Sequence, residues 1–213
     1  MLGVNDLAFY PFSFYQFRYL QFNMVTKIIQ SILPISINSC DSIENLIEYI
    51  EYKKGATFIK ERQNNSKEYF ILDGICRSYL YSPEGEEITI SFFSSKSILS
   101  PFMTRTSNRK SSLNFQALTD LKLGVMDASK FENLMVENLE IREFGNTVLR
   151  NELKLKVEKE IGLVSTTASE RLLRFRQEFP LFENLIPHPA IATYLGITNV
   201  SLSRLRREVL KKG

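Results

Sequence analysis

The sequence predicts an α+β fold in which a β-roll or β-sandwich precedes a long helix and a C-terminal helix-turn-helix. Three observations support this prediction. Short runs of β-branched and aromatic residues, separated by turns that contain Gly, fill residues 52–126. A helical pattern without proline covers residues 138–162, and two short helical patterns meet at Gly196.

Composition excludes several classes of protein. The 213 residues are 44% hydrophobic and 24% charged, as in globular proteins. Two cysteines cannot alone ligate an iron–sulfur cluster, and one histidine excludes haem, zinc and cupin-type sites built on several histidines, so we expect no cofactor. We find no Ser/His/Asp set, phosphate loop or convincing pair of carboxylates, and expect no enzyme. Sparse cysteines favour a cytoplasmic protein, and no apolar run is long enough for a membrane span.

The N-terminal part predicts two helices behind an aromatic leader. Residues 1–23 show no signal-peptide pattern. They are either a peripheral aromatic arm or an extension in front of the start, and we favour the extension because Met24 opens a more ordinary helix pattern. A helix over residues 24–33 would end at Pro34, and a second over residues 41–49 would be capped by Asp41 or Ser42. Residues 24–137 would form the first domain.

Six strands are expected in this domain. The runs alternate or are rich in β-branched and aromatic residues, and they are bounded by turn signals such as Asp73-Gly74. The predicted strands cover residues 56–60, 68–72, 75–81, 86–93, 114–118 and 121–126. No strand–Gly-loop–helix spacing typical of a phosphate-binding α/β fold is present.

A short helix beginning at Asp127 and a long helix over residues 138–162 follow. Apolar residues on the long helix form two lines, which predict two neighbours: the helix's own β domain and a second surface. We favour a dimer helix over one buried within a single chain. The residues assigned to it are Ile141, Phe144, Val148, Leu149, Leu153 and Leu155.

Residues 138–164 would therefore form a dimerisation helix and hinge, and residues 165–213 a basic domain. Residues 165–213 hold eight basic and four acidic side chains, whereas the rest of the chain holds 19 and 20. A helix over residues 168–179 would point Leu172, Leu173 and Phe175 inward and end at Pro180. The basic excess favours a module that faces phosphate.

Residues 189–209 carry the helix-turn-helix pattern. Gly196 allows a left-handed turn, Ile197 would fill the space between the helices, and Thr198 is a good N-cap. The second helix would place Val200, Leu202, Leu205 and Val209 on one side and Ser201, Ser203, Arg204 and Arg207 on the other. A plain helical hairpin with solvated arginines is the alternative.

This order of elements resembles the Crp/Fnr family of bacterial transcription regulators, of the cyclic-AMP receptor protein type. The resemblance covers about residues 24–211. It is carried by YFILDG followed by Arg77, by GEE before a strand ending in Phe92-Phe93, and by IATYLGIT with LSRLR. It implies a cyclic-nucleotide-binding type of β-roll, a dimerisation helix and a DNA-binding helix-turn-helix.

The resemblance also implies roles for individual residues. Asn199, Val200 and Ser201 open the recognition helix, and Arg204 matches the family's guanine-contacting arginine. Val200 replaces an acidic base reader, so the target half-site should differ. Contact with double-stranded DNA is expected from His188, Thr198, Asn199, Val200, Ser201, Ser203, Arg204 and Arg207.

Two departures from the family pattern are visible. The Gly-Glu and Arg-Ser/Thr pairs that hold a cyclic phosphate are missing, so we expect no such binding of cyclic AMP. A pocket for an unknown effector would instead involve Ile98, Leu99, Ser100, Lys110, Ser111 and Ser112. Residues 179–187 are too short and proline-broken for two wing strands, so the winged helix should be reduced.

The sequence thus predicts a homodimeric DNA-binding regulator of the Crp/Fnr type that reads two-fold symmetric sites. Its expected partners are DNA, a second copy of the chain and, as further candidates, RNA polymerase and a small-molecule effector. The alternative is a β-roll module for small molecules or proteins without regulated DNA binding.

Overall fold

The computed structural model describes residues 24–100, 102 and 108–210, and it contains the predicted β-roll and long helix. The roll consists of two four-stranded antiparallel sheets. One sheet has the order β1 (Glu48–Tyr52), β8 (Leu121–Asp127), β3 (Lys67–Asp73) and β6 (Ser97–Leu99). The other has the order β2 (Thr57–Ile59), β7 (Asn114–Ala117), β4 (Ile75–Tyr81) and β5 (Glu87–Ser94). Residues 1–23, and with them the expected extension, lie outside the described residues.

The inner faces of the two sheets enclose the core of the roll. Alternating residues of each strand point inward, as expected for strands with one solvated face. Leu99 and Leu123 from the first sheet pack with Cys76, Phe115 and Ala117 from the second, and none of the five is more than 2% exposed.

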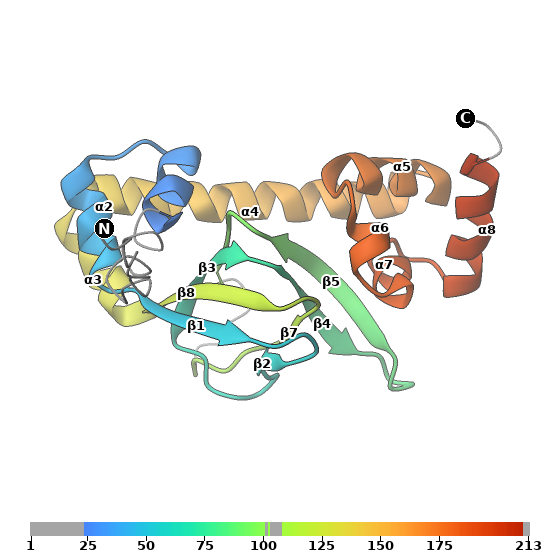
Figure 1. Ribbon diagram of the computed structural model, residues 1–213, viewed down its shortest axis with the longest axis horizontal. Coiled ribbons are helices and arrows are strands. Elements are labelled where there is room, and N and C mark those ends of the chain that lie inside the picture. Colours follow the sequence, from blue (N-terminus) through green and yellow to red (C-terminus); the bar gives the residue numbers. More distant parts are fainter. Residues whose placement is uncertain (1–23, 101, 103–107, 211–213) are drawn as a thin grey trace, which may run out of the picture.

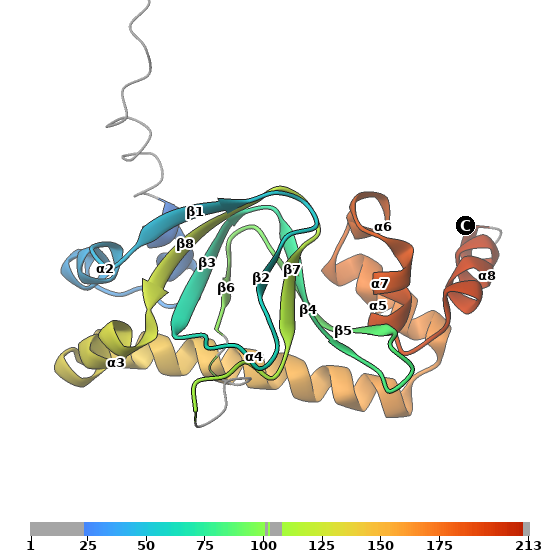
Figure 2. The ribbon, with the colours of Figure 1, turned by 90° about the horizontal axis from the view of Figure 1, so that it is seen from below.

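A single long helix runs along the roll and joins the two ends of the molecule (Figure 1). This helix, α4 (Leu139–Ser165), follows α3 (Ala128–Glu137), and the side chains of Asp127 and Asn138 cap the two helices. At one end of α4 lie α3, α2 (Ile37–Glu44) and the helix over residues 24–32. At the other end lie the C-terminal helices, as Figure 2 shows from a second direction.

The C-terminal part contains four helices. They are α5 (Ala168–Glu178), α6 (Phe182–Leu185), α7 (His188–Tyr194) and α8 (Asn199–Leu210). Thr167 and Glu170 form a capping box at the start of α5. Residues 179–187 hold α6 where two wing strands would otherwise stand.

The second N-terminal helix was predicted too late in the chain. The helix α2 begins at Ile37 because Ser36 caps it, accepting a hydrogen bond from the Ser39 N–H. It ends at Glu44, and Tyr49 lies in β1 opposite Gly124. The apolar residues 43–47 that suggested a longer helix include the turn into this strand.

Two strands escaped prediction. β1 reads EYIEY and has no fully buried residue, and β6 is three residues long. Both are edge strands of the first sheet, where a weak or short pattern is enough because only one neighbour is paired. The long helix also ends later than expected: α4 continues through Gly162, and the backbone first becomes extended at Thr166.

None of the helices in the described residues has the length and hydropathy that a transmembrane span requires. The same residues contain no group of three or more His, Cys, Asp or Glu side chains placed to hold a metal ion.

A buried carboxyl ties the N-terminal helices to the roll. Glu44 is 4% exposed and accepts hydrogen bonds from the Thr26 N–H (3.0 Å), the Thr26 hydroxyl (3.2 Å) and the Tyr49 hydroxyl (3.3 Å). Burial outweighs these hydrogen bonds and raises the pKa of Glu44 to about 7. The folded chain is therefore more stable, relative to the unfolded chain, when this carboxyl is protonated.

We expect Glu44 to make the stability of the chain depend on pH. Between about pH 4.5 and 7 the folded chain retains a proton that the unfolded chain has released, so the free energy of unfolding should fall as pH rises. The expected fall is about 3 kcal/mol in urea denaturation, since the pKa rises from 4.5 to about 7 and each unit corresponds to about 1.4 kcal/mol. Glu44→Gln should lack this part of the slope, and Glu48→Gln, on the exposed face of β1, should retain it. Equal slopes in all three chains would contradict the assignment.

Candidate functional site

The two helices α7 and α8 meet in a tight turn at Gly196. Gly196 has φ of +67°, a conformation that costs a side-chain-bearing residue. The Ile197 N–H donates to the carbonyl of Ala192 (3.0 Å) and the Gly196 N–H to that of Thr193 (3.1 Å), which together form a Schellman motif. The turn closes α7 and sends the chain directly into α8.

Helix α8 presents a polar face to solvent. The Thr198 hydroxyl caps it, accepting the Ser201 N–H at 3.1 Å, as the sequence predicted. Leu202 is 1% exposed and anchors the opposite face. Val200, which the pattern placed with the apolar side, is 63% exposed. The exposed side chains at the start and along the free face are Thr198, Asn199, Val200, Ser203, Arg204 and Arg207, with Ser201 half-buried.

An ionic network braces α8 against α6 and α5. Glu183 binds Arg176 from α5 (2.5 Å) and Arg206 from α8 (2.9 Å), with its own side chain 15% exposed. Nη1 of Arg206 also lies 3.2 Å from Nδ1 of His188. Since a guanidinium only donates, Nδ1 accepts, and the Nε2–H of His188 donates to the Glu183 carbonyl at 3.0 Å.

This network corrects one expectation from the sequence. His188 was expected to contact phosphate, but both of its ring nitrogens are engaged within the chain. His188, at the start of α7, instead links this helix to α6 and α8. The sequence did not indicate Glu183 or Arg206 as site residues, because neither belongs to the motif and the contact depends on how α6 folds back.

The C-terminal helices share a hydrophobic core with the roll. Phe92 of β5 is 7% exposed and inserts among aromatic rings of α5, α6 and α7. Its ring centroid lies 5.0 Å from that of Tyr194, 5.7 Å from Phe182 and 6.0 Å from Phe175 and Phe179. Such separations are typical of favourable aromatic pairs. Leu173, expected to point inward from α5, is 45% exposed and takes no part.

The free edge of β5 is covered by α4 and α7. β5 pairs only with β4 in its sheet, so its other edge exposes unpaired backbone groups. The Thr89 N–H donates to the hydroxyl of Thr193 in α7 (3.1 Å). Nζ of Lys159 in α4 donates to the Ile90 carbonyl (2.6 Å). Ile90 is the extra residue of a β-bulge, which turns its carbonyl away from β4.

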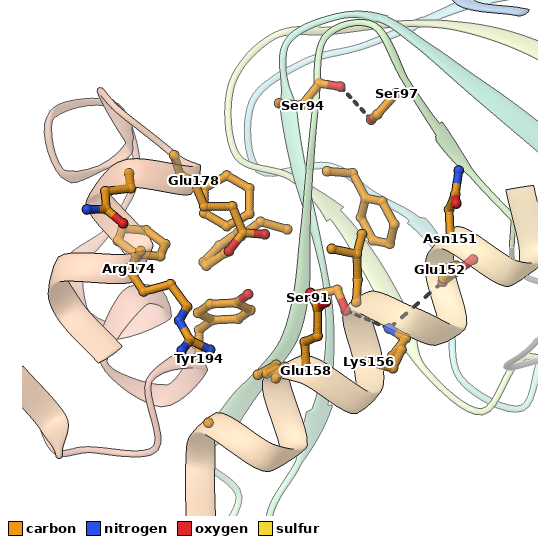
Figure 3. Close-up of a pocket in the computed structure, with 18 of the residues that line it drawn as sticks. Ser91, Ser94, Ser97, Asn151, Glu152, Lys156, Glu158, Arg174, Glu178 and Tyr194 are labelled. Carbon is orange, nitrogen blue, oxygen red and sulfur yellow. Dashed lines mark hydrogen bonds and ion pairs between the residues drawn. The ribbon is translucent and has the colours of Figure 1, made fainter. Parts of the chain in front are cut away.

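A cavity of about 800 Å³ opens where roll, α4 and α5 meet (Figure 3). Its walls come from residues 91–98, from α4 between Val148 and Leu163, and from α5 with the end of α7. In Figure 3, Lys156 and Glu152 lie on one side and Tyr194, Arg174 and Glu178 on the other. The volume lies within the range of small-molecule sites.

Burial perturbs the ionisable groups of this cavity. Burial, together with the nearby charge of Lys156, lowers the pKa of Lys159 to about 8. Burial likewise lowers the pKa of Lys156 and raises the pKa values of Glu152 and Glu178. A cluster of desolvated charges in a cleft is a common property of binding sites.

The residues predicted for the effector pocket do not all line this cavity. Ile98 does, but Leu99 is 0% exposed and packs in the core of the roll. Ser111 is 1% exposed, and its hydroxyl donates to the Leu113 carbonyl at 2.7 Å, so it is committed to a turn. Ser100 is half-buried, and Lys110 and Ser112 are exposed. Of the six residues, only Ile98 lines the junction cavity, and the predicted effector pocket stays a prediction.

The two apolar lines of α4 have different partners. Ile141 and Phe144 are 0% and 1% exposed and pack in their own chain's core, with Val148 against it. Assigning Ile141 and Phe144 to a dimer contact was therefore wrong, because no partner can reach them. Leu153 is 51% exposed, Leu155 is 57% exposed and lines the cavity, and Leu149 is half-buried.

Comparisons with known proteins agree with this geometry. Residues 49–138 match the family model of the cyclic nucleotide-binding domain. FixK2 from Bradyrhizobium japonicum is 19% identical over 78% of this chain and 86% of that chain, with a TM-score of 0.68. The chain shares its fold with this structure. A protein of Eubacterium rectale described as a transcriptional regulator of the Crp/Fnr family is 18% identical over 86% and 89%, with a TM-score of 0.67.

A third similar structure is that of a regulator that responds to c-di-GMP. CLP of Xanthomonas campestris, a c-di-GMP responsive global regulator, is 10% identical over 84% of this chain and 93% of that chain, with a TM-score of 0.66. No curated protein matches the sequence. At these identities the comparisons establish the fold, and function must be argued from the site.

We expect Phe92 to control how firmly the C-terminal helices dock on the roll. Phe92→Ala should lower the free energy of unfolding by about 3–5 kcal/mol and speed amide exchange in α7 more than in β8. Phe115→Ala is the matched control, since Phe115 is equally buried but lies inside the roll. The same exchange pattern in both variants would show that Phe92 has no special role in docking.

Proposed function

We propose that the chain is a sequence-specific DNA-binding transcription regulator of the Crp/Fnr type. The observation that carries the proposal is the α7–turn–α8 unit, whose capped second helix exposes a polar and basic face. Helices joined in this way place the second helix in the major groove, with its first residues at base edges. The basic excess of residues 165–213 would supply affinity for phosphate.

Two arginines would have different tasks on DNA. Arg204 lies on the exposed face one turn past the start of α8, within reach of a guanine edge. Arg207 lies one turn further along, and its Nε donates to the Ser203 carbonyl at 3.4 Å, which fits a contact with phosphate. Asn199, Val200 and Ser201 would meet bases, and the exposed Val200 could contact a thymine methyl.

The regulator would act as a homodimer through α4. Leu153, Val157 and Ile161 recur at helical spacing and are 51%, 45% and 55% exposed. A row of large apolar side chains on the free face of a helix is a typical surface for pairing with a second copy. Two such chains would place their α8 helices in successive major grooves, about 34 Å apart.

The effector is proposed to differ from cyclic AMP. Ser111 occupies the position at which the family pattern would hold the phosphate-binding arginine, and its side chain is buried in a turn. We expect calorimetry to detect no tight binding of cyclic AMP. A heat of binding that corresponds to micromolar affinity or better would contradict this part of the proposal.

Selection from random duplex DNA tests the central proposal. The full chain should enrich a two-fold symmetric site. On that site Arg204→Ala should cost about 1–3 kcal/mol and relax one base position in each half-site. Arg207→Ala should instead weaken binding to all DNA sequences alike. It should also reduce the slope of log affinity against log salt concentration by about one.

If the folded chain enriches no site, the proposal that it is a DNA-binding regulator is wrong. It would favour the β-roll interaction module without regulated DNA binding. Equal loss on all sequences for Arg204→Ala would reassign that residue to a phosphate contact.

A further inference from the structure

The cavity at the junction carries an excess of positive charge. Two lysines of α4, Lys156 and Lys159, stand one turn apart on its wall, together with Lys96, Arg171 and Arg174 from the other walls. Three carboxylates, Glu152, Glu158 and Glu178, line the same space. The guanidinium of Arg171 is already held within the protein, because its Nε donates a hydrogen bond to the Leu195 carbonyl at 2.9 Å.

The two α4 lysines are only weakly neutralised. Nζ of Lys156 lies 2.6 Å from the Ser91 hydroxyl but 3.8 Å from the nearest carboxylate oxygen, that of Glu152. Nζ of Lys159 donates to the Ile90 carbonyl and lies 4.0 Å above the Tyr194 ring. Among the described residues, no carboxylate comes within 4.0 Å of it. Each ammonium has three hydrogens, so donors remain for an added anion.

The carboxylates of the cavity do not compensate for this. Glu158 lies 3.8 Å from Lys154, on the exposed side of α4. Glu178 is exposed at the end of α5, where desolvation raises the pKa of its carboxyl and the charges of Arg174 and Lys159 act against this rise. Of the two desolvated lysines, Lys156 has one carboxylate oxygen at 3.8 Å, and Lys159 has none within 4.0 Å among the described residues.

The C-terminal helices contribute aromatic rings to the cavity, and Lys159 lies above one of them. Tyr194 and Phe179 are half-buried and line the cavity, and Phe175, which is 1% exposed, packs against both, with ring centroids 5.3 to 6.2 Å apart. An elongated ligand could contact these rings at one end and the lysines at the other. Cavities that combine apolar walls with a few convergent polar groups are typical ligand sites.

We propose that the junction cavity binds a small amphipathic anion, in which a carboxylate, sulfonate or phosphate group is attached to a flat aromatic body. The anion would lie against Lys156 and Lys159, and the aromatic body against Tyr194 and Phe179. The site does not depend on whether α8 binds DNA.

The position of the site gives such a ligand a regulatory consequence, which does rest on the proposed function. A molecule that touches β5, α4 and α5 together binds the docked arrangement of the C-terminal helices more tightly than an undocked one. It therefore stabilises the docked arrangement by mass action. In a regulator this would fix the orientation of α8.

The test uses two fluorescent probes that differ by one charge. The full chain is titrated with 8-anilinonaphthalene-1-sulfonate and with N-phenyl-1-naphthylamine, which lacks the sulfonate. We expect saturable binding of the sulfonate at one site per chain, about tenfold tighter than binding of the neutral probe. Lys159→Gln and Lys156→Gln, which keep a hydrogen-bond donor, should each remove most of this difference.

Lys130→Gln is the matched control, because Lys130 is an exposed lysine on α3 away from the cavity. Hydrogen exchange of the unaltered chain provides a readout that needs no variant: the sulfonate probe should protect amides in residues 91–98 and 174–179. Equal affinity for both probes, no effect of the two cavity lysines, or unchanged exchange in these segments would each overturn the proposal. So would absence of binding, as expected if a second copy of the chain fills the cavity. None of these outcomes bears on the DNA selection, so the two proposals fail separately.

Discussion

The arrangement of this molecule depends on one edge of β5, with which no other strand pairs. An edge strand exposes backbone donors and acceptors that must be hydrogen-bonded or solvated. Here the Thr89 N–H is taken by α7 and the Ile90 carbonyl by Lys159 of α4, while Phe92 inserts its ring between the C-terminal helices. A single strand thereby fixes the roll, the long helix and the C-terminal unit relative to one another.

The same docking determines how the proposed DNA-reading face is presented. Helix α7 lies against β5, and the Schellman turn at Gly196 transmits its orientation to α8. Glu183 and His188 then hold α8 through Arg206, so that the recognition face is supported from behind by ionic and polar contacts. Arg206 makes these contacts with the rest of the C-terminal unit, and Arg204 and Arg207 are exposed to solvent.

The junction cavity and the docking contacts involve the same residues. Lys156 and Lys159 donate to β5 and also line the cavity, and Tyr194 belongs both to the aromatic cluster around Phe92 and to the cavity wall. A bound anion would therefore act on the contacts that hold the C-terminal unit in place. This couples occupancy of the cavity to the orientation of α8 without requiring a signal to cross the interior of the roll.

Local patterns in the sequence determined most elements. Turn residues and alternation specified six of the eight strands, and the caps at Asp127, Asn138, Thr167 and Thr198 set the starts of four helices. These features rest on contacts within a few residues. Only the tertiary structure decided that Ile141 and Phe144 face their own core, that His188 is held by Arg206, and that Phe92 joins β5 to the C-terminal helices. Each of those contacts joins side chains far apart along the chain or depends on which of two apolar faces meets the roll, and periodicity alone does not specify the partner.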